Sequence, residues 1–116
     1  MANVQIWHNT RCSKSRQTLA LLEENGISSE VKHYLEESIS ETELREVLGL
    51  LKMTPRALMR TKESEYKELG LDEVSLSDDV LIEAMIKHPK LIERPIVIHG
   101  NRAVLGRPPE NVLEII

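Results

Sequence analysis

The sequence predicts one α/β domain over residues 1–116, with a four-stranded mixed sheet and a helical insert at about 40–88. Three observations predict this class. A strand pattern, a helix pattern and a second strand pattern follow one another within about 30 residues, the length of a β-α-β unit. Signals for helix starts then recur up to residue 88, and two short strand patterns joined by a tight turn precede a final helix. A chain of 116 residues has room for one sizeable core.

The first β-α-β unit covers residues 4–35. Residues 4–8 alternate apolar and polar side chains, which is typical of a strand. Residues 13–25 are rich in helix formers and end before Gly26, a common C-terminal helix cap. Residues 31–35 alternate again and predict the second strand. Cys12 therefore lies at the turn between the first strand and the first helix.

The segment at about 40–88 predicts helices. Ser40 and Glu43 have the spacing of a capping box, and an apolar helical face follows them. Thr54 and Pro55 mark a second helix start. Further helices are expected at residues 64–69 and from Ser77 to a stop at residues 88–89.

The last part of the chain predicts a hairpin and a helix. Residues 95–99 and 102–105 are expected strands around Gly100–Asn101, a two-residue turn in which glycine supplies a positive φ. Residues 108–110 begin a final helix that carries Val112, Leu113 and Ile116. The resulting order, β-α-β, helical insert, β-β-α, matches the thioredoxin-like architecture.

Composition excludes several classes of function. The net charge is −4 and 3% of the residues are aromatic, whereas nucleic-acid binding favours basic grooves and aromatic stacking surfaces. No segment approaches the roughly 20 apolar residues that span a bilayer, and the first ten residues lack the apolar run of a secretory signal. We therefore expect a monomeric, cytoplasmic protein that binds neither nucleic acid nor membrane.

Metal and disulfide chemistry are not expected either. The single cysteine excludes an intrachain disulfide and a cysteine-cluster zinc site. The four histidines, at positions 8, 33, 88 and 99, are too far apart for a local metal motif. We expect no bound metal or organic cofactor.

Cys12 is the candidate nucleophile. It stands in the polar segment HNTRCSKSR, where the N–H groups and the positive end of the following helix should stabilise a thiolate. Arg11, Lys14 and Arg16 add positive charge nearby. The ordinary alternative is a buried, inert cysteine, which these polar neighbours disfavour. We therefore expect a reactive thiol with a lowered pKa.

The tetrad that begins at Cys12 indicates a thiol without a partner in the chain. Cys12-Ser13-Lys14-Ser15 has the form of a thioredoxin-type motif in which Ser15 replaces the second cysteine. A single thiol needs an external thiol to remove whatever forms on it. Ser15 is either a useful hydroxyl donor one helical turn on or a solvent-facing residue of the first turn, and the sequence leaves both open.

Four motifs, in order, resemble those of the glutaredoxin-coupled arsenate reductases: HNTRCSKSRQTLALLEENG, ALMR, ERPIVI and GRP. The resemblance extends from Val4 to Ile116. It implies that Cys12 attacks the arsenic of arsenate and that Arg60, Arg94 and Arg107 hold the oxyanion. It also implies that His8 helps to lower the thiol pKa, that glutathione is a co-substrate and that glutaredoxin is a partner. Some longer members carry a C-terminal extension that has no counterpart here.

The arginine chemistry fits this implication. Planar guanidinium groups bind tetrahedral oxyanions through paired N–H groups. Arg94 and Arg107 each precede a proline at an element boundary, and Arg60 is expected on the helical insert. In thioredoxin-like folds a cis-proline at the place of Pro95 faces the catalytic cysteine, although the sequence does not decide its isomer.

Two other functions remain open. One is a non-catalytic thioredoxin-fold regulator or adaptor that binds a protein partner. Such relatives typically use a Cys-x-x-Cys switch, for which this chain has Ser15 in place of the second cysteine. The other is a glutathione-dependent oxidoreductase that acts on another substrate. A phosphatase-like arsenate-reducing loop is excluded, because the sixth residue after Cys12 is Thr18 and not arginine.

Overall fold

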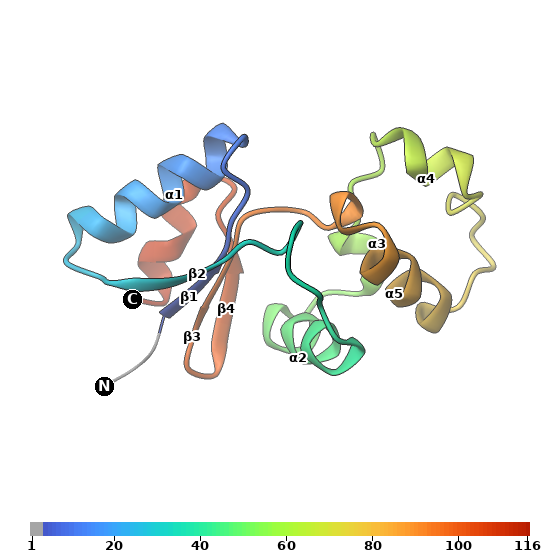
Figure 1. The fold of residues 1–116 in the computed structure, drawn as a ribbon. Coiled ribbons are helices and arrows are strands. Elements are labelled where there is room, and N and C mark those ends of the chain that lie inside the picture. The colour runs from blue at the N-terminus through green and yellow to red at the C-terminus, as the bar shows by residue number, and fades with distance from the viewer. Residues whose placement is uncertain (1–3) are drawn as a thin grey trace. The chain divides into compact units, whose positions relative to one another are not determined.

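The computed structural model describes residues 4–116, and the chain divides into two compact units (Figure 1). The first unit ends at Glu37 and resumes from Arg94 to Ile116, while the second comprises Ser38–Glu93. The second unit is the predicted helical insert, but it extends past residue 88. The extension arises because the 3-10 helix η1 (Pro89–Leu91) and a β-bridge between Met59 and Ile92 belong to it. The single-domain organisation over 1–116 stays a prediction.

The first unit contains the four-stranded mixed sheet, which confirms the predicted α/β, thioredoxin-like class. Its strands are β1 (Val4–Trp7), β2 (Ser29–Lys32), β3 (Ile96–His99) and β4 (Arg102–Leu105), in the order β2-β1-β3-β4. β1 is parallel to β2, and the helix α1 (Ser13–Glu24) connects them. β3 is antiparallel to both β1 and β4, and Gly100 has a φ of 62° in the hairpin turn.

The core of the first unit lies between the sheet, α1 and the 3-10 helix η2 (Pro109–Glu114). It is a cluster of buried aliphatic side chains, Val4, Ile6, Leu22, Val97, Val112 and Ile115. Since successive side chains of a strand point to opposite faces, Trp7 lies on the other side of the sheet from Ile6. There it stacks on Tyr34, with the ring centroids 6.3 Å apart.

Two predicted elements of this unit are wrong in detail. The second strand occupies Ser29–Lys32 and not residues 31–35, because the chain turns at His33, whose carbonyl accepts N–H bonds from Glu36 and Glu37. The final helix is a 3-10 helix and not an α-helix. Its three-residue period places Val112 and Ile115 in the core and leaves Leu113 exposed.

The second unit consists of the predicted helices. They are α2 (Glu41–Leu51), α3 (Pro55–Leu58), α4 (Ser64–Glu68) and α5 (Asp78–Lys87), and α2 and α3 both contact α5. Ser40 forms the predicted capping box with Glu43, while Thr54 and Ser77 cap α3 and α5 through their hydroxyl oxygens. No helix within residues 4–116 is long and apolar enough to cross a membrane.

Gly106, which follows β4, is expected to tolerate no side chain. A Cβ there would lie 2.5 Å from Thr18 Oγ1 and 2.7 Å from Pro95 Cγ. We expect Gly106→Ala to lower the free energy of unfolding by about 1–3 kcal/mol, the usual cost of overpacking. Gly49→Ala is the control, because a Cβ at this position in α2 meets nothing within 4 Å and alanine favours helices by about 0.5–1 kcal/mol. Thermal unfolding measures both, and equal melting temperatures would contradict the close packing.

Candidate active site

Cys12 lies between β1 and α1, at the N-terminal cap of the helix. Its backbone is extended, with φ −93° and ψ 122°, and its N–H donates to the Asn9 carbonyl over 3.0 Å. Its own carbonyl accepts the first helical hydrogen bond, from Arg16 N. The side chain is 7% exposed. The sulfur is thus held at the end of a helix whose first N–H groups have no partner within the helix.

Two arginines of the C-terminal segment of the first unit lie beside this sulfur. Arg107 Nη2 donates to Cys12 Sγ over 3.7 Å, and the Arg94 side chain also forms a hydrogen bond with the thiol. The two arginines are joined, because Arg107 Nε donates to the Arg94 carbonyl over 2.7 Å. The Arg94–Pro95 and Arg107–Pro108 peptide bonds are both cis. The Cys12 sulfur therefore lies beside two guanidinium groups, an arrangement suited to a multiply charged oxyanion.

Opposing effects act on the pKa of the Cys12 thiol. Burial raises it, whereas the backbone N–H groups of Ser15 and Lys14 and the Arg94 guanidinium lower it. Hydrogen bonds and a cation both favour the charged form. The lowering effects prevail, so the pKa of Cys12 lies below the ordinary value for a thiol.

We expect the alkylation rate of Cys12 by iodoacetamide to reach half its plateau below the ordinary thiol pKa of about 8.5. The thiolate is the reactive form, so a lowered pKa moves the whole rate profile to lower pH. Arg94→Ala should move the midpoint upward, because it removes a cation that stabilises the thiolate. A wild-type midpoint at or above about 8.5 would contradict the activated thiolate.

Ser15 and His8 form a buried pair beside the cysteine. His8 Nδ1 and Ser15 Oγ share a hydrogen bond of 2.6 Å, and Ser15 Oγ also accepts from Asn9 N over 3.0 Å. Ser15 is fully buried, so its reading as a solvent-facing residue is wrong. Asn9 contacts Ser15 and Cys12 through its backbone N–H and carbonyl and not its side chain, so its residue type carries no sequence signal for this role.

His8 carries little positive charge near neutral pH. Burial, together with the charges of His33 and Arg16, lowers its pKa below the ordinary 6.5. Its ring is hydrogen-bonded to Ser15 and lies 6.2 Å from the His33 ring, centroid to centroid, and Ser15 in turn accepts the N–H of Asn9 in the loop that precedes Cys12. A direct role of His8 in lowering the pKa of Cys12 stays a prediction from the resemblance.

Arg60 belongs to the second unit. It follows α3 and does not lie within a helix, and its N–H donates to the Leu91 carbonyl over 2.7 Å. Its guanidinium is paired with two carboxylates, Glu93 over 2.6 Å and Glu63 over 3.3 Å. The first unit thus brings together Cys12, His8, Ser15, Arg94 and Arg107, and the participation of Arg60 stays a prediction.

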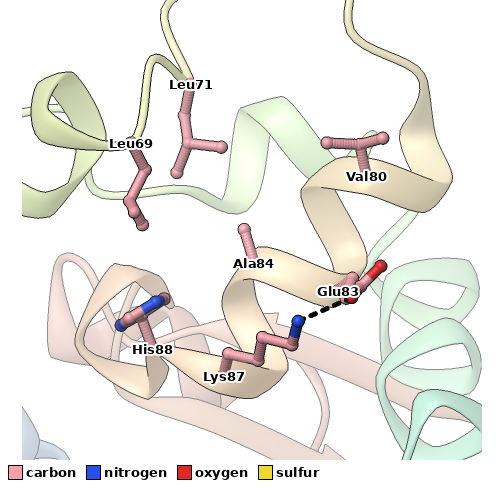
Figure 2. A pocket seen from close by; sticks show the side chains of 7 residues that line it. All are labelled: Leu69, Leu71, Val80, Glu83, Ala84, Lys87 and His88. Atoms are coloured by element: carbon pink, nitrogen blue, oxygen red, sulfur yellow. Dashed lines mark ion pairs between the residues drawn. The ribbon is translucent and has the colours of Figure 1, made fainter.

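A separate pocket of about 250 Å³ lies in the second unit (Figure 2). It is lined mainly by apolar side chains of the α4–α5 region, and the Glu83–Lys87 ion pair of 2.8 Å lies at its edge. Its lining includes no cysteine and no arginine. Over residues 4–116, no group of three or more His, Cys, Asp or Glu side chains is placed to hold a metal ion. Cys12 and its arginines therefore form the candidate active site.

Comparison with known proteins points to one family. Residues 7–115 match the ArsC family. An arsenate reductase of Haemophilus influenzae is 50% identical over 98% of this chain and 99% of its own. An uncharacterized Escherichia coli protein, YfgD, is 55% identical over 97% of this chain and 96% of its own. A solved structure described as an arsenate reductase from Vibrio cholerae has a TM-score of 0.96 at 55% identity, covering 99% of this chain and 98% of that one.

Proposed function

Because this chain belongs to the ArsC family, we propose that it reduces arsenate to arsenite with Cys12 as the nucleophile. The observation that carries the proposal is the convergence of Arg94 and Arg107 on the Cys12 sulfur. Arsenate is a compact tetrahedral anion, so its oxygens can accept from both guanidinium groups while its arsenic faces the thiolate. The arsenate reductase activity of similar proteins supports the choice of substrate.

In the first step the Cys12 thiolate forms a sulfur–arsenic bond and an arsenate oxygen leaves as water. Arsenic stays pentavalent in this condensation, so no electron donor is needed. Negative charge on the remaining oxygens is stabilised by Arg94 and Arg107. Such fixed donors, aimed at the charge that develops, commonly supply the largest share of catalysis.

The reducing electrons come from outside the chain. Cys12 is its single cysteine, so no second thiol of the chain can resolve the adduct. We assign this task to glutathione, which condenses with the arsenic and releases a second water. A glutaredoxin thiolate then attacks the glutathione sulfur, and the electron pair of the sulfur–arsenic bond reduces arsenic to the trivalent state. Hydrolysis of the Cys12–arsenic bond releases arsenite, and two thiols end as one mixed disulfide.

The glutathione-dependent scheme fits a cytoplasmic protein, since the reduced thiol pool is kept there. It requires no bound cofactor. Arg60 enters the scheme as a third anion-binding arginine only through the resemblance.

The test is an arsenate-dependent assay of the purified protein with three reductant systems: glutathione alone, glutathione with glutaredoxin, and thioredoxin with its reductase. We expect turnover with glutathione and glutaredoxin and little with the other two. Turnover with thioredoxin alone would retain arsenate reduction and refute the glutathione route. No turnover with any system would refute arsenate reduction and favour the adaptor or another substrate.

A further inference from the structure

The Asn111 side chain, which lies outside the proposed anion site, forms hydrogen bonds with the backbone on both sides of Gly106. Asn111, in the first turns of η2, donates from Nδ2 to the carbonyl oxygens of Leu105 and Arg107, each over 3.1 Å. One amide group thus uses both of its hydrogens on the two residues that flank Gly106. A nitrogen must face both carbonyls, so the orientation of the amide is set by its partners.

A second side chain, that of Thr18 in α1, contacts the same backbone. Thr18 is fully buried, and its hydroxyl donates to the Lys14 carbonyl over 2.8 Å, while the Gly106 carbonyl lies 3.4 Å from the same Oγ1 and shares its single hydrogen. The contact with Gly106 is so close that a Cβ there would lie 2.5 Å from Thr18 Oγ1. The same helix begins beside Cys12. Thr18 therefore relates the position of the Arg107 backbone to the helix whose N-terminus holds the sulfur.

We propose that Asn111 and Thr18 are positioning residues, which together fix the Gly106–Arg107 backbone so that the Arg107 guanidinium stays beside Cys12. Arg107 is an exposed residue with a long side chain, and its guanidinium donates to Cys12 Sγ and to the Arg94 carbonyl. A small shift of its backbone would carry the guanidinium away from the sulfur. Misplacement by about 1 Å can cost about 10²-fold in rate.

The first test does not depend on the substrate. Iodoacetate is an anion and iodoacetamide is neutral, and both react with the same Cys12 thiolate. The ratio of their rate constants therefore reports the positive charge beside the sulfur and cancels any change in thiolate fraction. We expect the ratio to fall in Arg107→Ala, Asn111→Ala and Thr18→Val. Thr18→Ser, which keeps the hydroxyl, should stay near the wild-type ratio.

The matched control is Asn25→Ala. Asn25 also donates from Nδ2 to a carbonyl, that of Leu21 over 2.8 Å, but it lies at the far end of α1. This helix has 12 residues, so its ends are about 18 Å apart. The Asn25 variant should keep the wild-type ratio. If it lowers the ratio as much as Asn111→Ala does, the proposal is overturned.

A double variant separates positioning from a loss of fold. Once Arg107 is alanine, Asn111→Ala should cause no further fall in the ratio, because there is no guanidinium left to position. If Asn111→Ala lowers the ratio equally in the wild-type and Arg107→Ala backgrounds, Asn111 has a general structural role and the proposal is overturned. A wild-type ratio in Asn111→Ala would overturn it as well. If Asn111→Ala does not fold, the alkylation ratios of Thr18→Val and Thr18→Ser test the same proposal.

The kinetic arm of this inference rests on the proposed arsenate reduction. There, Asn111→Ala should lower kcat/KM by up to about 10²-fold in wild type and by nothing further in the Arg107→Ala background. If the wild type does not turn over arsenate but the alkylation ratios of the variants change as expected, the positioning role stands and the proposed substrate is refuted.

Discussion

Cys12→Ser is expected to reduce arsenate turnover to the rate seen without protein, while the fold remains intact. Serine is nearly the same size as cysteine, but its hydroxyl stays protonated at neutral pH and is a far weaker nucleophile. In the wild type, Ser15, Lys14 and Arg94 all act to keep the thiol ionised. The measurement is the arsenate-dependent rate with glutathione and glutaredoxin. A variant that keeps a rate near wild type would refute the covalent mechanism.

The fold of the Cys12→Ser variant can be checked together with the pKa. A thiol whose pKa is lowered by folding binds fewer protons in the folded than in the unfolded protein, at pH values between the two pKa values. The wild type should therefore gain stability relative to Cys12→Ser as pH rises through this window, which lies below and up to the unfolded thiol pKa of about 8.5. The gain is lost again as pH falls through the folded pKa. Urea unfolding at several pH values measures the difference.

Arg94→Ala is expected to lower kcat/KM for arsenate by about 10²–10³-fold, the usual cost of losing one fixed oxyanion donor. The Arg94 side chain is hydrogen-bonded to the Cys12 thiol, so alanine also removes a group that lowers the thiol pKa. Arg94→Lys should recover only part of the loss, because an ammonium keeps the charge and lacks the planar pair of N–H groups. Arg107→Ala should behave similarly.

Arg45→Ala is the control for these arginine variants. Arg45 lies on α2 and pairs with Glu41 and Asp79 through exposed side chains. Exposed ion pairs contribute little to stability, and we expect kcat/KM to stay at the wild-type value. If Arg94→Ala and Arg45→Ala prove equally harmless, the anion is not bound where we propose.

Local patterns were sufficient for most of the elements and for the position of Cys12. The caps at Ser40, Thr54 and Ser77 and the turn at Gly100 were predictable because each rests on contacts within a few residues. The same holds for the position of Cys12 before a helix, since its neighbours in sequence are also its neighbours in space.

The sequence by itself thus determined the strand and helix order, the class of fold, and a single cysteine placed before the first helix. Tertiary structure alone decided that Tyr34, just beyond the end of the second strand at Lys32, stacks on Trp7. It also decided that Ser15 is buried against His8, and that Asn111 and Thr18 hold the backbone around Arg107. For the Thr18 contact the physical reason is separation along the chain: Thr18 and Gly106 are 88 residues apart, and a contact of that range leaves no periodic signal in either segment.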